Sequence, residues 1–370
     1  MDHQKVNTAL LFTIAVVAVG SVLAITGTIV IPFVIAVMLY FLVAPVVQLL
    51  ARMHVPRGLS ILIVLVMVLA FGFLIGLILY SSVQALLREF PRYQVRFIEI
   101  LTDLTTRFEL PDEVLDQFDL TRTARVYLLS LSGNFMSFVS GLVIVLVFLL
   151  FLLLEKPYLK SKLTQALKDH TTRKIAIVFE HINAEIGRYL RVKLLISTLT
   201  GSIVYVAFSI IGVDFPFVWA VLTLLFNFIP NLGSIIITVL SVLFALLQFA
   251  PDWNPVIATA ITMALSQFTI GNVLDPKLVG QSLNLSPVII LISLLFWGWL
   301  WGPIGMFLAV PLTVAMKITF ENIPALEPVG ILMGTGNYKQ RKRSIPWSRR
   351  GFAANGGTVH TNNHEHNKDS

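Results

Sequence analysis

Apolar positions fall into long runs separated by short polar segments. The runs cover approximately residues 8–26, 29–50, 58–83, 135–154, 194–212, 216–229, 232–250, 255–274, 287–301 and 303–320. Several exceed the roughly 18 apolar residues that cross a hydrocarbon core of about 30 Å. Backbone groups cannot stay unpaired in lipid, so such runs predict helices, whereas a barrel would show short alternating strands. The pattern predicts an all-α, polytopic integral membrane protein with about eight transmembrane helices.

One pair of runs differs from ordinary spans. The run 216–229 is short, and it ends in the sequence Ile229-Pro230-Asn231-Leu232-Gly233. Short apolar segments broken by proline or glycine point to transporter binding sites. The runs 216–229 and 232–250 are therefore either two spans or one re-entrant hairpin. Both alternatives leave an odd number of crossings in this half of the chain, so parity does not decide between them.

The polar segments divide the chain further. Residues 84–133 mix arginine with acidic residues, which indicates an external helical element. In 160–193 apolar residues recur at helical spacing, which predicts an amphipathic helix that lies on the cytoplasmic leaflet or docks on the bundle. We expect three transmembrane helices in 1–83, the external element in 84–133, and the fourth span with the amphipathic helix in 134–193. A transport-site bundle would follow in 194–320, and a largely disordered cytoplasmic tail in 321–370.

Composition and charge agree with a membrane location. Of 370 residues, 56% are hydrophobic and only 13% are charged, too few to cover a soluble protein of this length. The net charge is +7, but Lys and Arg occupy short segments between the apolar runs, so we expect no nucleic-acid partner. They concentrate in 51–58, in 155–193 (ending at Lys193) and in the tail after Glu321. The positive-inside rule places these segments, and hence both termini, in the cytoplasm.

Several kinds of chemistry have no basis in the sequence. There is no phosphate-binding G-x-x-x-x-G-K-[ST] loop, no H-E-x-x-H zinc motif and no G-x-S-x-G nucleophile motif. No histidine lies between His181 and His360, which removes the commonest general base. The absence of cysteine excludes disulfides and thiolate metal sites. We therefore expect no enzyme activity, no cofactor and no metal site.

One ionisable residue in the apolar C-terminal half differs from the rest. On a helix ending near residue 274, Gln267, Gly271 and Asp275 would fall within about 80° of one another and form a polar stripe. Asp275 would then be an ion-coupling group at the cytoplasmic end of a solute pathway. Alternatively, it belongs to an interfacial Asp-Pro turn that ends the helix, with Lys277 extending to the interface nearby. The sequence leaves both interpretations open.

Amide side chains add a second candidate region. A buried amide must find hydrogen-bond partners, either in a neighbouring helix or in a hydrated cavity. Pro230 removes a backbone donor and frees a carbonyl, which favours a binding role at that turn. The candidate pathway residues are Asn227, Pro230, Asn231, Gly233, Gln267, Gly271, Asn272 and Asn284.

Three blocks of sequence resemble a known family. They are Phe226 to Gly233, Gly271 to Gly280 and Phe296 to Met306, the last followed by Val310-Pro311-Leu312-Thr313. In this order, within about residues 8–325, they resemble the autoinducer-2 exporter family of bacterial inner-membrane permeases. The resemblance implies export of small metabolites such as the quorum-sensing signal autoinducer-2, although other relatives act as sodium or lithium/proton antiporters. It also implies association of subunits into a homo-oligomer.

Three functions remain open at this stage. The first is alternating-access export of a small polar metabolite. The second is cation/proton antiport, with Asp275 exchanging its proton for a cation. The third is a membrane scaffold that transports nothing and uses 84–133 or 160–193 as its partner surface. The expected partners are the lipid bilayer, a small polar solute or cation, and further copies of the chain.

Overall fold

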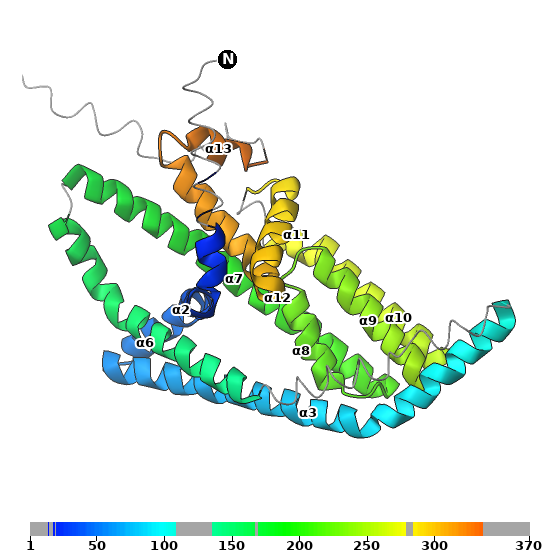
Figure 1. Ribbon diagram of the computed structural model, residues 1–370. Coiled ribbons are helices and arrows are strands. Elements are labelled where there is room, and N and C mark those ends of the chain that lie inside the picture. Colours follow the sequence, from blue (N-terminus) through cyan, green and yellow to red (C-terminus); the bar gives the residue numbers. More distant parts are fainter. Residues whose placement is uncertain are drawn as a thin grey trace, which may run out of the picture.

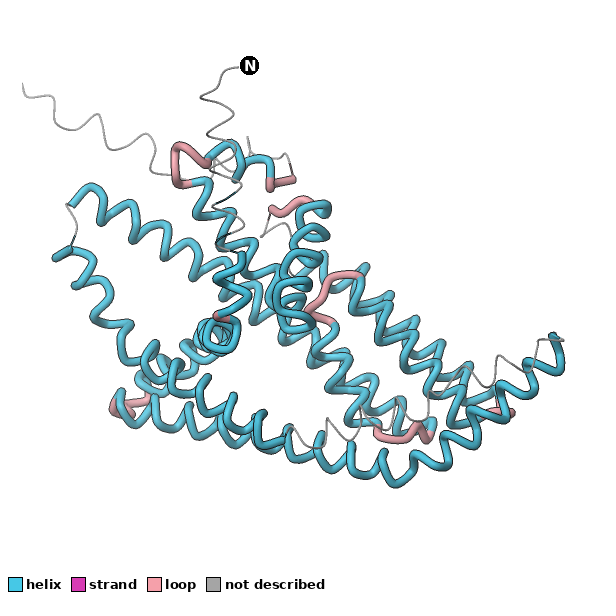
Figure 2. The backbone as a smooth tube through the Cα atoms, in the orientation of Figure 1, coloured by secondary structure: helices cyan, strands magenta, loops and turns pink. Residues whose placement is uncertain are grey.

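The computed structural model describes residues 14, 18, 20–108, 135–166, 169–278 and 284–335, and every regular element in these ranges is a helix (Figures 1 and 2). Six described helices are long and apolar enough to cross a membrane, which confirms the all-α, polytopic prediction. This number is below the expected eight because helices α8 and α10 are shorter. The first apolar run, 8–26, also falls largely outside the described ranges, apart from a helical stretch at 20–25.

The N-terminal helices form one group. They are α2 (Gly27–Arg52), α3 (Arg57–Phe108) and α6 (Phe135–Ala166). Ala36 and Val43 of α2 pack in a core with Val64 of α3 and Leu149 of α6. Phe41 of α2 packs instead in a second core, which includes residues of α7 and α12. Helix α2 is thus shared between the two halves of the molecule.

Helix α3 continues well beyond the predicted end of the third span. It runs without interruption through Pro91 to Phe108, so residues 84–108 extend the span instead of forming a separate element. Tyr93 in this extension is buried, and its hydroxyl donates to the Asp214 carboxylate at 2.6 Å. Figure 1 shows α3 running along one side of the molecule toward the far ends of α9 and α10. Residues 109–134, the rest of the predicted element, lie outside the described ranges.

The predicted amphipathic helix and the fifth span are a single helix, α7 (Asp169–Ile211). Its apolar residues Ile186, Tyr189 and Leu190 are buried in the core that also contains Phe41. Residues from Val178 onward therefore dock on the bundle rather than lie on a leaflet. Before them, α6 extends to Ala166 and takes up the first part of the segment 160–193.

Helices α8 (Pro216–Phe226) and α9 (Leu232–Phe249) form a hairpin. The side chain of Gln248, near the end of α9, accepts from the backbone N–H of Asp214 at 2.9 Å and donates to the Gly212 carbonyl at 2.8 Å. The end of α9 therefore lies beside the turn from which α8 starts. The 11 residues of α8 rise only about 16 Å, roughly half of a hydrocarbon core. Segment 216–250 is thus a helical hairpin whose first arm, α8, is short for a complete span.

The two helices approach closely at the tip of this hairpin because residue 233 is a glycine. A Cβ atom added to Gly233 would lie 1.8 Å from the carbonyl oxygen of Phe226, at the end of α8. Between them, Asn231 has a positive φ of 60°, a conformation that asparagine tolerates better than most residues. The broken sequence predicted around Pro230 is therefore a tight connection between two antiparallel helices.

The chain then returns along the hairpin. Helix α10 (Trp253–Thr269) packs beside α9 and ends in a π-turn, η1 (Ile270–Leu274), which passes into the short helix α11 (Asp275–Leu278). Helix α12 (Pro287–Glu321) follows, and α13 (Glu327–Leu332) packs against its end. Figure 1 shows α8, α9 and α10 extending from the middle of the molecule to one end, with α13 near the other.

Helix α12 is itself a second hairpin. Gly302 has φ 64° and ψ −146°, a non-helical conformation that divides the helix into two halves. Ser293 in the first half donates to the Ala309 carbonyl of the second at 3.2 Å, and its hydroxyl also contacts that of Thr313. The tip of the first hairpin packs on the second half of α12, since the rings of Phe228 and Phe307 have centroids 4.5 Å apart.

We predict that Gly233→Ala strongly destabilises the protein. The added methyl group would overlap the Phe226 carbonyl, and overpacking of this kind typically costs about 1–3 kcal/mol. The midpoint of thermal denaturation in detergent should fall clearly below that of the wild type. Gly141→Ala in α6 is the matched control, because its Cβ would meet nothing within 4 Å. An unchanged midpoint for Gly233→Ala would show that the tip is not packed as described.

The α12 hairpin predicts a specific cross-link. The chain contains no cysteine, so a Ser293→Cys/Thr313→Cys variant carries only the two new thiols. Because the two native hydroxyls touch, mild oxidation should join these thiols and abolish their labelling by a maleimide. In a control pair, Ser293→Cys/Thr319→Cys, the second thiol lies further along the helix, so both thiols should stay reduced and react with the maleimide. Cross-linking of the control pair in preference to the first would contradict the hairpin register.

Candidate functional site

A line of polar residues follows one face of α7. Tyr189, Lys193, Ser197 and Thr200 recur at intervals of three or four residues, and all four are 5% exposed or less. This spacing places them on one side of the helix. Because these residues are buried, the line carries hydrogen-bonding groups into the interior of the bundle. Its two ends meet different parts of the candidate site.

Near the N-terminal end of this line, Lys193 forms an ion pair with Asp275. Lys193 Nζ lies 2.7 Å from Asp275 Oδ2, and the side chains are 6% and 26% exposed. The other carboxylate oxygen, Oδ1, is buried and has no hydrogen-bond partner among the described residues. Removing two charges from water costs several kcal/mol per ion, which their mutual attraction has to offset. Asp275 is therefore a half-buried residue with a partner on α7, whereas Lys277 is exposed.

The π-turn brings Asp275 to this position. The backbone N–H of Asp275 bonds to the carbonyl of Ile270, five residues earlier. Pro276 has no N–H, so a carbonyl in the preceding turn lacks its usual donor. Single π-turns inside helices occur frequently at functional sites. Two turns before Asp275, both polar atoms of the Gln267 amide are buried without a partner in the described part of the chain.

The other residues of the predicted stripe contribute less. Gly271 is exposed, and a Cβ there would meet nothing within 4 Å, so no helix or side chain packs closely upon it. The backbone of Asn272 belongs to the π-turn, but its side chain lies outside the described part of the structure. The polar stripe therefore rests on Gln267 and Asp275.

The C-terminal end of the polar line on α7 contacts the tip of the α8–α9 hairpin. Asn227 is 5% exposed, and its amide donates to Ser197 Oγ at 3.2 Å and to Thr200 Oγ1 at 3.4 Å. These bonds hold the end of α8 against α7, so Asn227 does act as a link between helices. Asn231 is exposed at the tip, and the Pro230 carbonyl accepts from the N–H of Leu232 at 2.6 Å.

Asn284 lies apart from this group. Its side-chain oxygen accepts from the backbone N–H of Thr335 at 3.2 Å and from the Thr335 hydroxyl at 2.5 Å. The nearby N–H of Ser286 donates to the Met333 carbonyl at 2.9 Å. Asn284 therefore fastens the segment after α13 to the start of α12. The predicted residues thus form separate groups. Residues 227–233 lie at the first hairpin tip, Gln267 lies on α10 with Asp275 just after it, and Asn284 lies near neither group.

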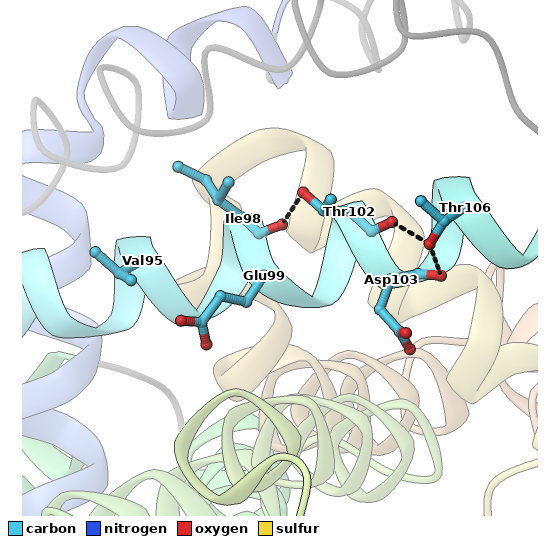
Figure 3. Close-up of a pocket in the computed structure, with 6 residues that line it drawn as sticks. All are labelled: Val95, Ile98, Glu99, Thr102, Asp103 and Thr106. Carbon is cyan, nitrogen blue, oxygen red and sulfur yellow. Dashed lines mark hydrogen bonds between the residues drawn. The ribbon is translucent and has the colours of Figure 1, made fainter.

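The surface hollows of the described chain do not coincide with these polar groups. One, of about 600 Å³, lies along the extension of α3, and Figure 3 shows that all its lining residues come from this single helix. Another, of about 340 Å³, lies between α7 and α10. Its lining is mostly apolar and includes Ile203, Leu265 and Leu274, with the hydroxyls of Thr262, Ser266 and Thr269. The ion pair and the hairpin tip are packed rather than open in this structure.

Lys193 is the residue that sequence reasoning missed. Counting charges assigns it to the basic segment 155–193, one position before the apolar run that begins at 194. Its spacing of four residues from Tyr189 and from Ser197 was the available signal, because it places Lys193 on the buried stripe of α7. The partner of Asp275 is thus a lysine from a different helix, more than eighty positions earlier.

Comparison with known proteins gives a consistent result. The model of the family described as "AI-2E family transporter" matches residues 9–325. A protein of Borreliella burgdorferi is 35% identical over 303 residues, which cover 82% of this chain and 84% of the relative. One of Haemophilus influenzae is 32% identical over 350 residues, covering 90% and 98%. Each of these two bears the name "putative transport protein".

A third relative carries a more specific name. The AI-2 transport protein TqsA of Escherichia coli is 29% identical over 315 residues, which cover 84% of this chain and 90% of TqsA. The range that the family model matches contains both hairpins and the positions of Lys193 and Asp275. The chain is a multi-pass membrane transport protein, and it belongs to the AI-2E transporter family.

Proposed function

We propose that the protein exports a small, uncharged, oxygen-rich metabolite such as autoinducer-2 by alternating access. It would do so across a bacterial inner membrane with both termini in the cytoplasm. The observation that carries the proposal is the packing of the first hairpin tip on the second hairpin, beside the polar line of α7. The distribution of Lys and Arg along the chain supports the orientation.

The depth of the first tip supports a binding role. Asn227 contacts Thr200, which lies 11 residues before the end of α7 at Ile211 and hence about 16 Å from it. This is near the middle of a hydrocarbon core of about 30 Å. Transporter sites formed by broken helices occur at that depth, where unwound backbone and helix ends offer hydrogen bonds to a solute.

The two hairpins approach this depth from opposite sides. The first begins and ends beside the turn at 212–214. The second follows α11, whose first residue, Asp275, pairs with Lys193 near the other end of the span in α7. A solute between the tips would therefore be separated from each side by one hairpin. The packed rings of Phe228 and Phe307 close the contact in this conformation, and alternating access requires the tips to move apart.

The available polar groups suit an uncharged solute. Asn231 at the tip, the Gln267 amide and Asp275 Oδ1 offer donors and acceptors, and the last two have no partner in the described part of the chain. A buried polar group without a partner costs about 1–3 kcal/mol. A hydroxylated metabolite can satisfy such groups and recover this free energy. The name of TqsA, an AI-2 transport protein, supports the same class of solute.

Cation/proton antiport is the second candidate function. Its support is the carboxylate of Asp275 inside the bundle, with one oxygen free of hydrogen bonds in the described residues. In this structure, however, the other oxygen is occupied by the ammonium group of Lys193. A cation would have to displace that group, which makes export of an uncharged solute the better-supported function.

We predict that Asn231→Gly slows export while Asn284→Gly does not. Both asparagines have a positive φ, which glycine adopts readily, so each change removes an amide with little strain. Loss of one hydrogen bond to the solute, about 1.4 kcal/mol, should lower the rate roughly tenfold for Asn231→Gly. The measurement is efflux of autoinducer-2 from loaded proteoliposomes. Wild-type export by Asn231→Gly, or an equal loss in Asn284→Gly, would contradict the assignment of the tip.

A further inference from the structure

The surroundings of Asp275 contain the components of a monovalent cation site. Its Oδ1 atom is buried without a hydrogen-bond partner among the described residues. Pro276 leaves a backbone carbonyl of the π-turn without its usual donor. Carboxylate, amide and carbonyl oxygens are the ligands that hard cations prefer. A carboxylate in such a setting, if it stood alone, would take up a cation from solution.

Lys193 already supplies a positive charge to this carboxylate, through its other oxygen. Its ammonium nitrogen lies 2.7 Å from Asp275 Oδ2. The residue is only 5% exposed, so its charge is directed into the bundle and not toward water. An ammonium group carries the same single positive charge as Na⁺ or K⁺, but here it is fixed covalently to α7. The pair as a whole is neutral.

We propose that Lys193 is a tethered cation, which neutralises Asp275 and thereby excludes free monovalent cations from the solute pathway. Lys193 is then a specificity-determining residue, because it selects uncharged solutes over ions without contacting the solute. This inference rests on the proposed transport pathway, and it extends that proposal by assigning the cause of discrimination against cations. Antiport in the wild type would require the opposite behaviour.

The test compares uptake of radioactive sodium into proteoliposomes by four proteins. Lys193→Met removes the charge but keeps a long, unbranched side chain that fills the same space. Breaking a buried pair leaves an uncompensated charge, so sodium uptake by this variant should exceed that of the wild type by roughly tenfold or more. Lys193→Arg keeps the charge and should behave as the wild type. The double variant Lys193→Met/Asp275→Asn removes both charges and should lose the gain.

Three results would overturn the inference. The first is a correctly folded Lys193→Met protein that takes up no more sodium than the wild type. The second is a gain of uptake that persists in the double variant, and the third is sodium uptake by the wild type itself, which would favour antiport. If Lys193→Met is not monodisperse in detergent, Lys193→Gln replaces it, because its amide still donates to Asp275 without a charge.

Autoinducer-2 efflux measured in the same vesicles separates this inference from the proposed function. If the wild type exports no autoinducer-2 but the gain of sodium uptake depends on Asp275, the tethered cation is supported and the proposed substrate is wrong. If the wild type exports autoinducer-2 and Lys193→Met gains no sodium uptake, the proposed function stands and the inference fails.

Discussion

Every polar group that this chain carries into the bilayer has to find its partner within the protein. Lipid offers no hydrogen bonds, so an isolated charge or amide there is costly. The polar line of α7 meets this constraint by pairing Lys193 with Asp275 and by supplying two hydroxyls to Asn227. These contacts fix the start of α11 and the end of α8 against the same helix. The position of the first hairpin tip follows from them.

The sequence contains the local breaks of this arrangement but not its long-range pairing. Pro230 and Gly233 mark the tip between α8 and α9 because proline and glycine have well-defined effects on the backbone. The antiparallel pairing of α8 with α9 depends instead on Gln248 meeting the turn at Gly212, a contact across 36 positions. No periodicity or charge count encodes such a contact.

The candidate site was predictable to a similar extent. Asn227 and Asp275 stand out as polar residues in apolar runs, and both prove to be buried or partnered in the bundle. Their partners do not stand out. Ser197 and Thr200 are ordinary residues of a membrane helix, and Lys193 lies at the edge of a segment rich in basic residues. The partner of Asn284 was equally hidden, since its amide oxygen accepts from Thr335 after α13.

The contact between Tyr93 and Asp214 has a mechanical consequence. It ties the distal part of α3, which belongs to the N-terminal group of helices, to the turn from which the first hairpin starts. The aromatic ring of Tyr93 also packs on Phe244 of α9, with centroids 5.4 Å apart. Any displacement of the hairpin relative to α2 and α6 must therefore either break these contacts of Tyr93 or move the end of α3 as well. Helix α3 would then transmit the motion of the hairpin to the N-terminal helices. Pro91, inside the helix just before Tyr93, is where α3 would bend.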